Sequence, residues 1–472
     1  MLFLSGNGKS TLLRVLHDAD AARSFVKIDG RIAKGDLLTG YLPQQIPEEV
    51  LHMPSRALLD KNPINFDYGK YYALLDAMAL PEDRIGSHPV GVLSGGEKIK
   101  LLLLSELMKN PGALLLDEPT NDLDLSGIQW LESFLIASDL PLLFVSHDEM
   151  LLERVANSII HIEQTFRRRE PRVTVSGLDY QAYAADRLHR VEKQSQLAVK
   201  EREIWEKKMA RFRKIRDRVD HEQRIISRKN PAGGRLLKKK MHTVQAMGRR
   251  FEKERENLTR RPDYEDSILF RFSDPVQVPS GKRMLDFFIQ PLAVNGRVLA
   301  ESVHLQVTGP EKIGIVGKNG CGKTTLLREL IAELKKGTIP FAYMPQEYGD
   351  RMDGDLNAVD FLLSKVAHAD TTRARTWLGS LKFSADEMLA PIRALSGGQR
   401  AKLYFAEMVL NQAEILILDE PTRNLSPLSG PEVREALAHF TGCVIAVSHD
   451  RKFLAEVFDT VYRLDENGLF LL

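Results

Sequence analysis

Long apolar stretches are absent from this sequence. Its longest apolar runs, at residues 112–116 and 140–145, are far shorter than the roughly 18 residues that argue for a membrane span. Residues 1–4 also lack the charged leader and the small-residue cleavage site of a secretory signal. We therefore expect a cytoplasmic protein with no transmembrane domain and no membrane partner.

Cysteine is scarce. Cys321 and Cys443 are the only two in 472 residues, too few for a disulfide framework, which fits a reducing compartment. The length corresponds to about two to three domains. The hydrophobic content of 43% is ordinary for cores of that size.

Positive charge is unevenly distributed along the chain. The net charge is only +2, but residues 183–262 hold 25 Lys+Arg against 11 Asp+Glu. The remainder of the chain is correspondingly acidic, with 41 Lys+Arg against 53 Asp+Glu. The sequence therefore has a basic middle segment between two acidic parts.

Three motifs occur twice, each time 302 residues apart. They are LSGGE at 93–97 and LSGGQ at 395–399, the carboxylate pairs Asp117-Glu118 and Asp419-Glu420, and Ser-His-Asp around His147 and His449. Each carboxylate pair begins 24 residues after the start of the first motif, and each histidine lies 29 residues after the glutamate. Such a repeat predicts a tandem of two nucleotide-binding halves.

The repeat predicts an α/β fold with two tandem nucleotide-binding domains joined by a long helical hairpin. Short apolar segments at 113–116 and 142–145 alternate with longer helical stretches, as in parallel α/β units. We expect the first domain at 1–179, the linker at 180–266 and the second domain at 267–472.

The linker pattern predicts two long helices around a turn at 230–234. The first, from about 183 to 224, would be ~60 Å long at 1.5 Å per residue. Apolar residues recur in each helix at spacings of three and four, which predicts that the helices zip together. These residues are Trp205, Met209, Phe212 and Val219 in the first helix, and Leu237, Met241, Val244, Phe251 and Leu258 in the second.

A phosphate-binding loop is predicted at residues 317–324, GKNGCGKT, after an apolar strand and before a helix. Its glycines let backbone N–H groups surround phosphates, Lys323 adds a cation, and the Thr324 hydroxyl is suited to Mg²⁺. Asp419 would hold the Mg²⁺ shell and Glu420 would polarise the attacking water. The nucleotide-binding candidates of this loop are Gly317, Asn319, Gly320, Gly322, Lys323, Thr324 and Thr325.

Together these residues resemble the signature set of ATP-binding-cassette ATPases, in both halves. The resemblance implies ATP and Mg²⁺ as cofactors and two composite sites, each with a histidine that senses the γ-phosphate. One site joins Lys323, Gln346, Glu420 and His449 with Ser94, Gly95 and Gly96. The other joins Gly6, Gly8, Lys9, Ser10, Thr11, Gln44, Glu118 and His147 with Ser396, Gly397 and Gly398. The Mg²⁺ ligands implied are Thr324, Gln346 and Asp419 in the first site and Ser10, Gln44 and Asp117 in the second.

The first half departs from the pattern before Lys9. Aligning residues 8–11 with the second loop places Phe3 where the first glycine belongs, and a Cβ there would crowd the turn. Only eight residues precede Lys9, against more than 50 in the second domain. We expect either a truncated chain or a defective first site, and favour truncation because the other site residues suit catalysis. In the second domain no aromatic residue lies between Phe288 and Lys323, so its adenine-stacking residue is not identified.

Two cassettes, no membrane domain and a charged hairpin between them resemble the ABC-F family of ribosome-associated ATPases. The family implies that the closed pair sits at the E site of the 70S ribosome and pushes its linker toward the P-site tRNA and the peptidyl-transferase centre of 23S rRNA. Independently, a local surplus of +14 suits a polyphosphate partner. The RNA-binding candidates are Arg224, Arg228, Lys229, Arg235, Lys238, Lys239 and Lys240. The alternative for each is a solvated cation paired with a glutamate of its own helix.

Within the family, the sequence resembles the antibiotic-resistance branch of the Lsa and Vga type. No long insertion separates Gln44 from Leu93, the chain stops at Leu472, and Ser426 replaces Asp124. That branch protects ribosomes from lincosamides, pleuromutilins and streptogramin A. The alternatives are a housekeeping translation ATPase acting on stalled ribosomes and a catalytically impaired product. A transporter subunit and a coiled-coil dimer are disfavoured, and we expect a monomer whose two halves close on each other.

Overall fold

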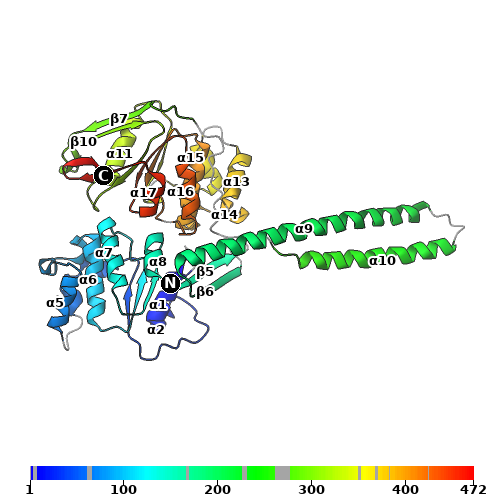
Figure 1. Cartoon of the computed structure of the whole chain (residues 1–472), viewed down its shortest axis with the longest axis horizontal. Helices are drawn as coiled ribbons and strands as arrows, with labels where there is room; N and C mark the ends of the chain where they lie inside the picture. The colour runs from blue at the N-terminus through cyan, green and yellow to red at the C-terminus, as the bar shows by residue number, and fades with distance from the viewer. Residues whose placement is uncertain are drawn as a thin grey trace. The chain divides into compact units, whose positions relative to one another are not determined.

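The computed structural model describes residues 2–3, 8–60, 66–165, 170–225, 231–260, 277–348, 352–366, 370–381, 383–423 and 425–472. The chain divides into two compact units, residues 1–180 with 265–472, and residues 181–264. The first unit contains two α/β halves, and the second contains a helical hairpin (Figure 1). The predicted fold class of two tandem α/β domains joined by long helices is confirmed.

Each half is built on a six-stranded sheet, and the two sheets have the same strand order. In the first half the order is β2 (Thr39–Leu42), β3 (Ala113–Asp117), β4 (Leu142–Val145), β1 (Leu2–Phe3), β5 (Ile159–Thr165) and β6 (Glu170–Ser176). In the second half it is β12 (Phe341–Met344), β13 (Ile415–Asp419), β14 (Cys443–Val447), β11 (Lys312–Val316), β15 (Thr460–Asp465) and β16 (Gly468–Leu471). The pairs are parallel except at β6 and β16, which are antiparallel to their neighbours. The strands predicted at 113–116 and 142–145 are β3 and β4.

The second half carries two further strand pairs before its phosphate-binding loop. β7 (Arg283–Ile289) pairs antiparallel with β10 (Val303–Thr308), and β8 (Leu292–Val294) pairs antiparallel with β9 (Arg297–Ala300). In the first half, the strand described before the loop is β1. The two halves therefore share a sheet order but differ in what the structure describes ahead of the loop.

The helices that position the site begin directly after strands or after turns that occur in both halves. In the first half these are α1 (Lys9–His17), α6 (Gly95–Met108), α7 (Leu125–Ile136) and α8 (Glu149–Val155); in the second half they are α11 (Lys323–Leu334), α15 (Gly397–Leu410), α16 (Gly430–Ala438) and α17 (Arg451–Val457). The other helices of the two halves are α2 (Ala19–Ala22), α3 (Glu48–His52), α4 (Ala57–Asp60), α5 (Tyr68–Ala77), α12 (Ala358–Lys365), α13 (Thr371–Ser380) and α14 (Ala385–Leu389).

Ser94 and Ser396 start α6 and α15 as N-caps. The Ser94 hydroxyl accepts from the Glu97 backbone N–H, while the Ser94 N–H donates to the Glu97 carboxylate at 2.8 Å. Ser396 and Gln399 repeat this arrangement. Such reciprocal capping satisfies two helix-end donors, so the S-x-x-E/Q part of the motif is itself a reason for the helix to begin there.

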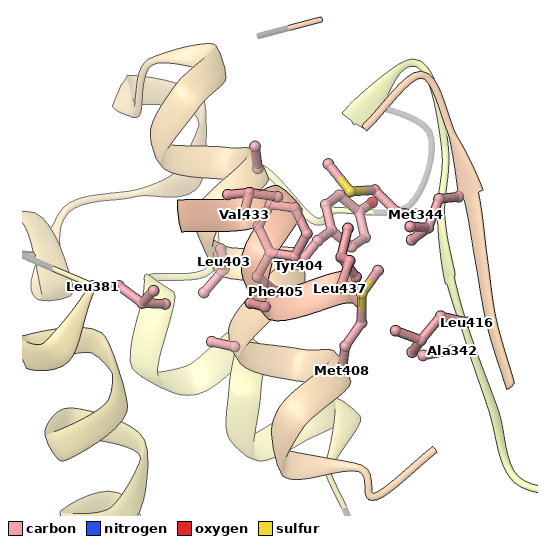
Figure 2. Close-up of a cluster of buried hydrophobic side chains, with 14 of the residues drawn as sticks. Ala342, Met344, Leu381, Leu403, Tyr404, Phe405, Met408, Leu416, Val433 and Leu437 are labelled. Carbon is pink, nitrogen blue, oxygen red and sulfur yellow. The ribbon is translucent and has the colours of Figure 1, made fainter. Parts of the chain in front are cut away.

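The core of the second half lies on both faces of its sheet. Alternate residues of β13 point to opposite faces, so Leu416 and Leu418 join one apolar cluster and Ile415 and Ile417 join the other. Figure 2 shows Leu416 beside Ala342 and Met344, facing the aromatic and aliphatic side chains of α15 and α16. Both faces are covered, which explains why the central strands are continuous apolar runs.

The register of β1 corrects the placement of Phe3. Leu2 pairs with Val145 of β4 and Phe3 with His161 of β5. Their equivalents 302 residues later, Val447 and Arg463, pair with Ile315 and Val316 of β11. Phe3 therefore corresponds to Val316, the last residue of a strand, and not to Gly317. The steric conflict predicted for Phe3 in the loop was wrong, because five residues separate Phe3 from Lys9 where six separate Val316 from Lys323.

The second unit is a hairpin of α9 (Tyr180–Ile225) and α10 (Pro231–Glu256), which lie side by side and antiparallel (Figure 1). The 46 residues of α9 span about 70 Å at 1.5 Å per residue. The predicted apolar stripes do zip together: Phe212, Val219 and Val244 are buried against one another, with Phe251 packed edge-on to Phe212.

The turn predicted at 230–234 was wrong at residues 231–234. Pro231, Gly233 and Gly234 form the first turn of α10. Proline is favoured there because the first helical residues have no intrahelical partner for their N–H groups. Asn230 lies outside the described residues. No helix in the described part of the chain is both long and apolar enough to cross a membrane.

Candidate nucleotide site

A cavity of about 1120 Å³ is bounded by residues of both halves. The second half contributes Asn319, Gly320, Gly322, Lys323, Thr324, Thr325, Gln346, Asp419, Glu420 and His449; the first contributes Gln44, Gly95, Lys98, Glu118, Asp122 and His147. Of the first predicted composite site, the structure brings Lys323, Gln346, Glu420 and His449 together with Gly95 of the LSGGE motif. It also brings Gln44, Glu118 and His147, expected at the other site, to the same cavity.

The second phosphate-binding loop joins β11 to α11. Gly320 and Gly322 have φ angles of 78° and 103°, a left-handed backbone that glycine adopts without strain. Lys323 Nζ donates to the carbonyls of Gly317 at 2.8 Å and Lys318 at 3.0 Å, which curls the loop around its side chain. A Cβ at Gly317 would lie 2.6 Å from the Leu464 carbonyl oxygen, so a side chain there would displace the loop.

Thr324 and Asp419 form the candidate metal position. The Thr324 hydroxyl donates to Asp419 Oδ2 at 2.9 Å, and Gln346 lines the same cavity. Burial raises the pKa of Asp419. Mg²⁺ prefers oxygen ligands and is usually held by one or two protein groups together with phosphate oxygens and water. These three oxygen donors fit that pattern, and the described residues contain no cluster of three or more His, Cys, Asp or Glu suited to a metal.

Glu420 follows the metal position and faces His449. Its φ of 50° is unusual for a residue with a side chain, and Glu118 has the same value. Glu420 Oε2 accepts from the His449 backbone N–H at 3.2 Å, and His449 Nε2 lies 3.6 Å from Glu420 Oε1. Burial raises the pKa of Glu420 to about 8 and lowers the pKa of His449 to about 4. His449 is therefore neutral near pH 7, and a positive charge brought into the cavity would favour ionisation of Glu420.

The first half reproduces this constellation with Lys9 close to it. Glu118 Oε1 lies 3.9 Å from Lys9 Nζ and 3.1 Å from His147 Nε2. Burial raises the pKa of Glu118 to about 7 and lowers the pKa of His147 to about 3. Burial also raises the pKa of Asp117, the neighbouring metal candidate.

The remaining candidates of the first loop and second signature lie away from the cavity lining. Gly8 precedes α1 with φ of 77°, and Ser10 and Thr11 follow Lys9 within α1. Gly397 and Gly398 start α15 directly after Ser396. None of these residues lines the cavity described above. Gly6 lies outside the described residues.

The β8–β9 hairpin forms a wall of the cavity that the motifs did not predict. Val294, Asn295, Arg297 and Leu299 line it. Asn295 and Gly296, with φ of 50° and 79°, make the two-residue turn, and Asn-Gly is the strongest short signal for such a hairpin. The sequence therefore carried the signal for the hairpin, but not for its position against the phosphate-binding loop. There, Leu299 lies 3.0 Å from where a Cβ on Gly322 would be.

Asp122 of the first half contacts the second half at two points in the cavity. Its carbonyl oxygen accepts from Asn319 Nδ2 at 2.6 Å, and its carboxylate pairs with Arg423 at 2.9 Å. Arg423 stands at the position of the repeat where the first half has Asn121, and this difference between the halves is visible in the sequence. Through these contacts, the phosphate-binding loop of the second half packs against Asp122 of the first half, which lies next to Gly95 of the LSGGE motif.

The comparisons with known proteins agree with this geometry. The family model described as "ABC transporter" matches residues 4–121 and 300–423, more than half of the chain. The chain belongs to the ABC transporter family. The matched ranges contain both phosphate-binding loops, the signature motifs LSGGE (93–97) and LSGGQ (395–399), and the carboxylate pairs of the Walker B motifs, Asp117-Glu118 and Asp419-Glu420.

Relatives named as members of the F family of ABC transporters are among the similar proteins. "ABC transporter F family member 2" of Arabidopsis thaliana is 28% identical over 87% of this chain and 57% of its own length. "Putative ATP-binding protein YdiF" of Bacillus subtilis is 32% identical over 81% of this chain and 56% of its own. "Probable ATP-binding protein YheS" of Escherichia coli is 29% identical over 83% and 58%. The chain thus spans just over half the length of these relatives.

Solved structures share the fold of the whole chain. A complex of "archaeal ribosomal stalk protein aP1 and archaeal ribosome recycling factor aABCE1" matches with a TM-score of 0.58 and 18% identity, covering 100% of this chain and 84% of that one. "Model of ribosome-bound archaeal Pelota and ABCE1" matches with the same TM-score and identity over 73% of that chain. At this identity the likeness concerns the arrangement of two ABC domains.

The basic candidates that the structure describes lie where α9 ends and α10 begins. Arg224 is exposed and pairs with Asp220 at 3.2 Å, and Lys240 Nζ lies 4.0 Å from Glu222. Arg235, Lys238 and Lys239 are exposed. Beside them, Ile225 and Leu236 are exposed apolar residues. Arg228 and Lys229 lie outside the described residues. The described end of the hairpin is therefore cationic with two apolar side chains.

Proposed function

We propose that the protein is an ABC-F ATPase that uses ATP to close its two halves and acts on the ribosome through its hairpin. The observation that carries the proposal is the shared cavity, which is lined by Lys323 and Glu420 of one half and by Gly95 of the other. Both halves are needed to complete such a site, so nucleotide binding would favour their closure.

The cavity residues divide the chemistry of phosphoryl transfer among themselves. Lys323 and the loop N–H groups would hold the β- and γ-phosphates, while Thr324, Asp419 and Gln346 would hold Mg²⁺. When bound, Mg²⁺ supplies charge compensation at the phosphate oxygens. Glu420 would orient the attacking water and accept its proton, and His449 would contact the γ-phosphate as a neutral imidazole. The same roles at the other site would fall to Lys9, Ser10, Gln44, Asp117, Glu118 and His147.

Arg297 and Val294 would bind the adenine in place of an aromatic side chain. They lie on the β8–β9 hairpin beside Gly322, and a guanidinium stacks on aromatic planes. We expect Arg297→Ala to raise the Kd for ATP about tenfold, measured by calorimetry, while the Kd for inorganic triphosphate changes less than twofold. Arg283→Ala, at an exposed arginine of β7, is the control. Equal weakening of ATP and triphosphate would contradict a role in base binding.

The hairpin would contact ribosomal RNA and tRNA. A cationic surface gains affinity for polyphosphates by releasing counterions, and exposed apolar groups such as Ile225 and Leu236 can pack against bases. The solved structures named above include a ribosome recycling factor and a ribosome-bound complex, which supports the same class of partner. The closed protein would act as a monomer in the cytoplasm.

Ribosome pelleting tests the proposal. The double variant Glu118→Gln/Glu420→Gln should bind ATP but hydrolyse it at least about 100-fold more slowly, since each glutamine cannot accept the proton. It should therefore co-sediment with 70S ribosomes in ATP and not in ADP. Adding Lys238→Gln, Lys239→Gln and Lys240→Gln should weaken retention and reduce its salt dependence. Retention that is the same in ATP and ADP would contradict the proposed switch.

Protection from antibiotics of the lincosamide, pleuromutilin and streptogramin A classes is the more specific form of this proposal. The observation that favours it is Ser426, which bonds Ser429 at 2.9 Å where the first half has Asp124 capping α7. Drug susceptibility with and without expression distinguishes it from the housekeeping alternative. We expect at least a fourfold rise in the inhibitory concentration, lost in Glu118→Gln/Glu420→Gln; no rise would favour a general translation ATPase.

A further inference from the structure

The surface where α7 and α8 meet α16 and α17 contains ion pairs that join the two halves. Arg434 of α16 donates to Glu149 of α8 at 2.7 and 3.1 Å in a two-pronged contact. Arg451 of α17 donates to Glu132 of α7 at 2.8 and 3.3 Å. Lys452 adds contacts to Glu149 and Glu153. All the carboxylates of these cross-pairs come from the first half and all the cations from the second.

The same positions of the repeat carry opposite charges in the two halves. At the offset of 302 residues, Glu132 corresponds to Arg434, Glu149 to Arg451, and Arg154 to Glu456. The two cross-pairs are therefore one contact made twice, related by the pseudo-twofold symmetry of the repeat. The supporting pairs within each half invert as well, since Arg154 bonds Glu132 and Arg434 bonds Glu456.

These pairs are buried enough for their sign to matter. The side chains of Arg434 and Glu149 are 4% and 8% exposed, and those of Arg451 and Glu132 are 14% and 3% exposed. Although burial opposes its charge, the hydrogen bonds that Arg434 donates to Glu149 and Glu456 raise its pKa above the usual value. A like charge in place of either partner would leave uncompensated buried charges, which are strongly unfavourable.

Glycine at position 430 makes room for one of the contacts. A Cβ on Gly430 would lie 2.2 Å from Glu149 Oε1 and 2.7 Å from the Arg434 guanidinium. The first half has Ile128 at the equivalent position. The α16 surface is thus shaped, as well as charged, to receive α8 of the first half.

We infer that these inverted charges form a recognition surface that lets the first half pair only with a second half, and that its partner is the second half of the same chain. In a contact between two first halves, Glu149 would face Glu132; between two second halves, Arg451 would face Arg434. Like charges in such a contact oppose pairing, so the surface favours one combination and disfavours the two symmetric ones.

Charge exchange in the full chain tests this inference. The first-half reversal is Glu132→Arg/Glu149→Arg/Arg154→Glu, and the second-half reversal is Arg434→Glu/Arg451→Glu/Glu456→Arg. Closure would be followed by energy transfer between dyes on Asp20→Cys and Lys336→Cys, at exposed positions in the two halves. Cys321→Ala removes the partly exposed native thiol, and Cys443 is buried.

We expect either reversal alone to lower the closed fraction in ATP at least tenfold, and the combined exchange to return it to within about threefold of the parent. Arg283→Glu/Arg463→Glu, at exposed arginines of the second half, is the control for added negative charge and should leave closure unchanged. A mixture of the two reversals should form a two-chain species by sedimentation, because one chain then has two basic surfaces and the other two acidic ones.

A combined exchange that closes no better than either reversal would overturn the inference, as would unchanged closure in the single reversals. If melting curves show that a reversal does not fold, the cycle of Glu132→Gln, Arg451→Gln and their double variant replaces it. In this cycle, we expect the effect of Arg451→Gln on the closed fraction to be at least fivefold smaller when Glu132→Gln is already present. Independent effects would equally overturn the inference, and a parent protein that self-associates would show that the partner is a second copy.

Discussion

At the scale of single residues, the two glutamates that follow the Walker B aspartates combine burial, positive φ and a neighbouring neutral histidine. Strained backbone and raised pKa values cluster at functional sites because only a rigid surrounding structure holds them. The same combination recurs 302 residues apart. Its occurrence in both halves indicates that it is a feature of the site and not of the local packing in one half.

The raised pKa of Glu420 predicts a pH-dependent effect of Glu420→Gln on stability. A carboxyl whose pKa rises from 4.5 to about 8 on folding stabilises the folded state below pH 4.5, and this contribution is lost as the pH rises through 8. Glutamine carries no such proton. In nucleotide-free protein, we expect the variant to gain at least about 1 kcal/mol relative to the parent between pH 5.5 and 8.5, measured by denaturant unfolding.

The control for this measurement is Glu333→Gln, at a half-exposed carboxylate paired with Lys336. Its stability difference from the parent should be nearly the same at both pH values. A flat difference for Glu420→Gln as well would show that Glu420 is ionised in the folded protein throughout this range.

At the scale of elements, the sequence predicted the helices of the hairpin and their apolar contact. Apolar residues spaced by three and four over such a length indicate amphipathic helices that pack along one face. Its turn was misplaced. Gly233 and Gly234 suggest a turn locally, yet they continue α10 in the structure. Local glycine preference amounts to about 1 kcal/mol per residue, which the packing of a long helix overrides.

Phe212 lies at the centre of the apolar contact between the two helices of the hairpin. It is buried against Val219, Val244 and Phe251, and a Cβ on Gly248 would lie 3.2 Å from its ring. We expect Phe212→Ala to lower the free energy of opening the hairpin by about 3 kcal/mol, seen as at least 50-fold faster hydrogen exchange in α9 and α10. Ile215→Ala, at an exposed position of the same helix, should change exchange less than threefold. Similar rates in both variants would show that the apolar stripe does not hold the helices.

At the scale of the whole molecule, the cavity depends on residues far apart in the sequence, because Gly95 and Lys323, 228 positions apart, both line it. A substitution in the first signature should therefore affect the second phosphate-binding loop. Cys321, within that loop, is partly exposed, so its reaction with a thiol reagent reports on nucleotide bound there. We expect ATP to slow this reaction at least tenfold.

Ser94→Ala and Ser396→Ala form a matched pair for this dependence. Each removes a helix N-cap and should cost about 1 kcal/mol of stability. Ser94→Ala should raise the ATP concentration that half-protects Cys321 about fivefold or more, whereas Ser396→Ala should change it less than twofold. Labelling would be followed by mass spectrometry, with Cys321→Ala as the blank. Equal effects of the two variants would contradict the predicted composition of the site.

The sequence by itself determined the tandem α/β architecture, the capped starts of α6 and α15, and the residues of each motif, because these follow from local spacing and from the repeat. Tertiary structure decided what depends on distant segments meeting. The register of β1 moved Phe3 out of the loop, the β8–β9 hairpin supplied Arg297 to the cavity, and Asp122 reached Asn319 and Arg423. The inverted charges at positions 302 residues apart were already written in the sequence. Their meaning emerged only when α7 and α8 faced α16 and α17, since a charge has no partner until the chain folds.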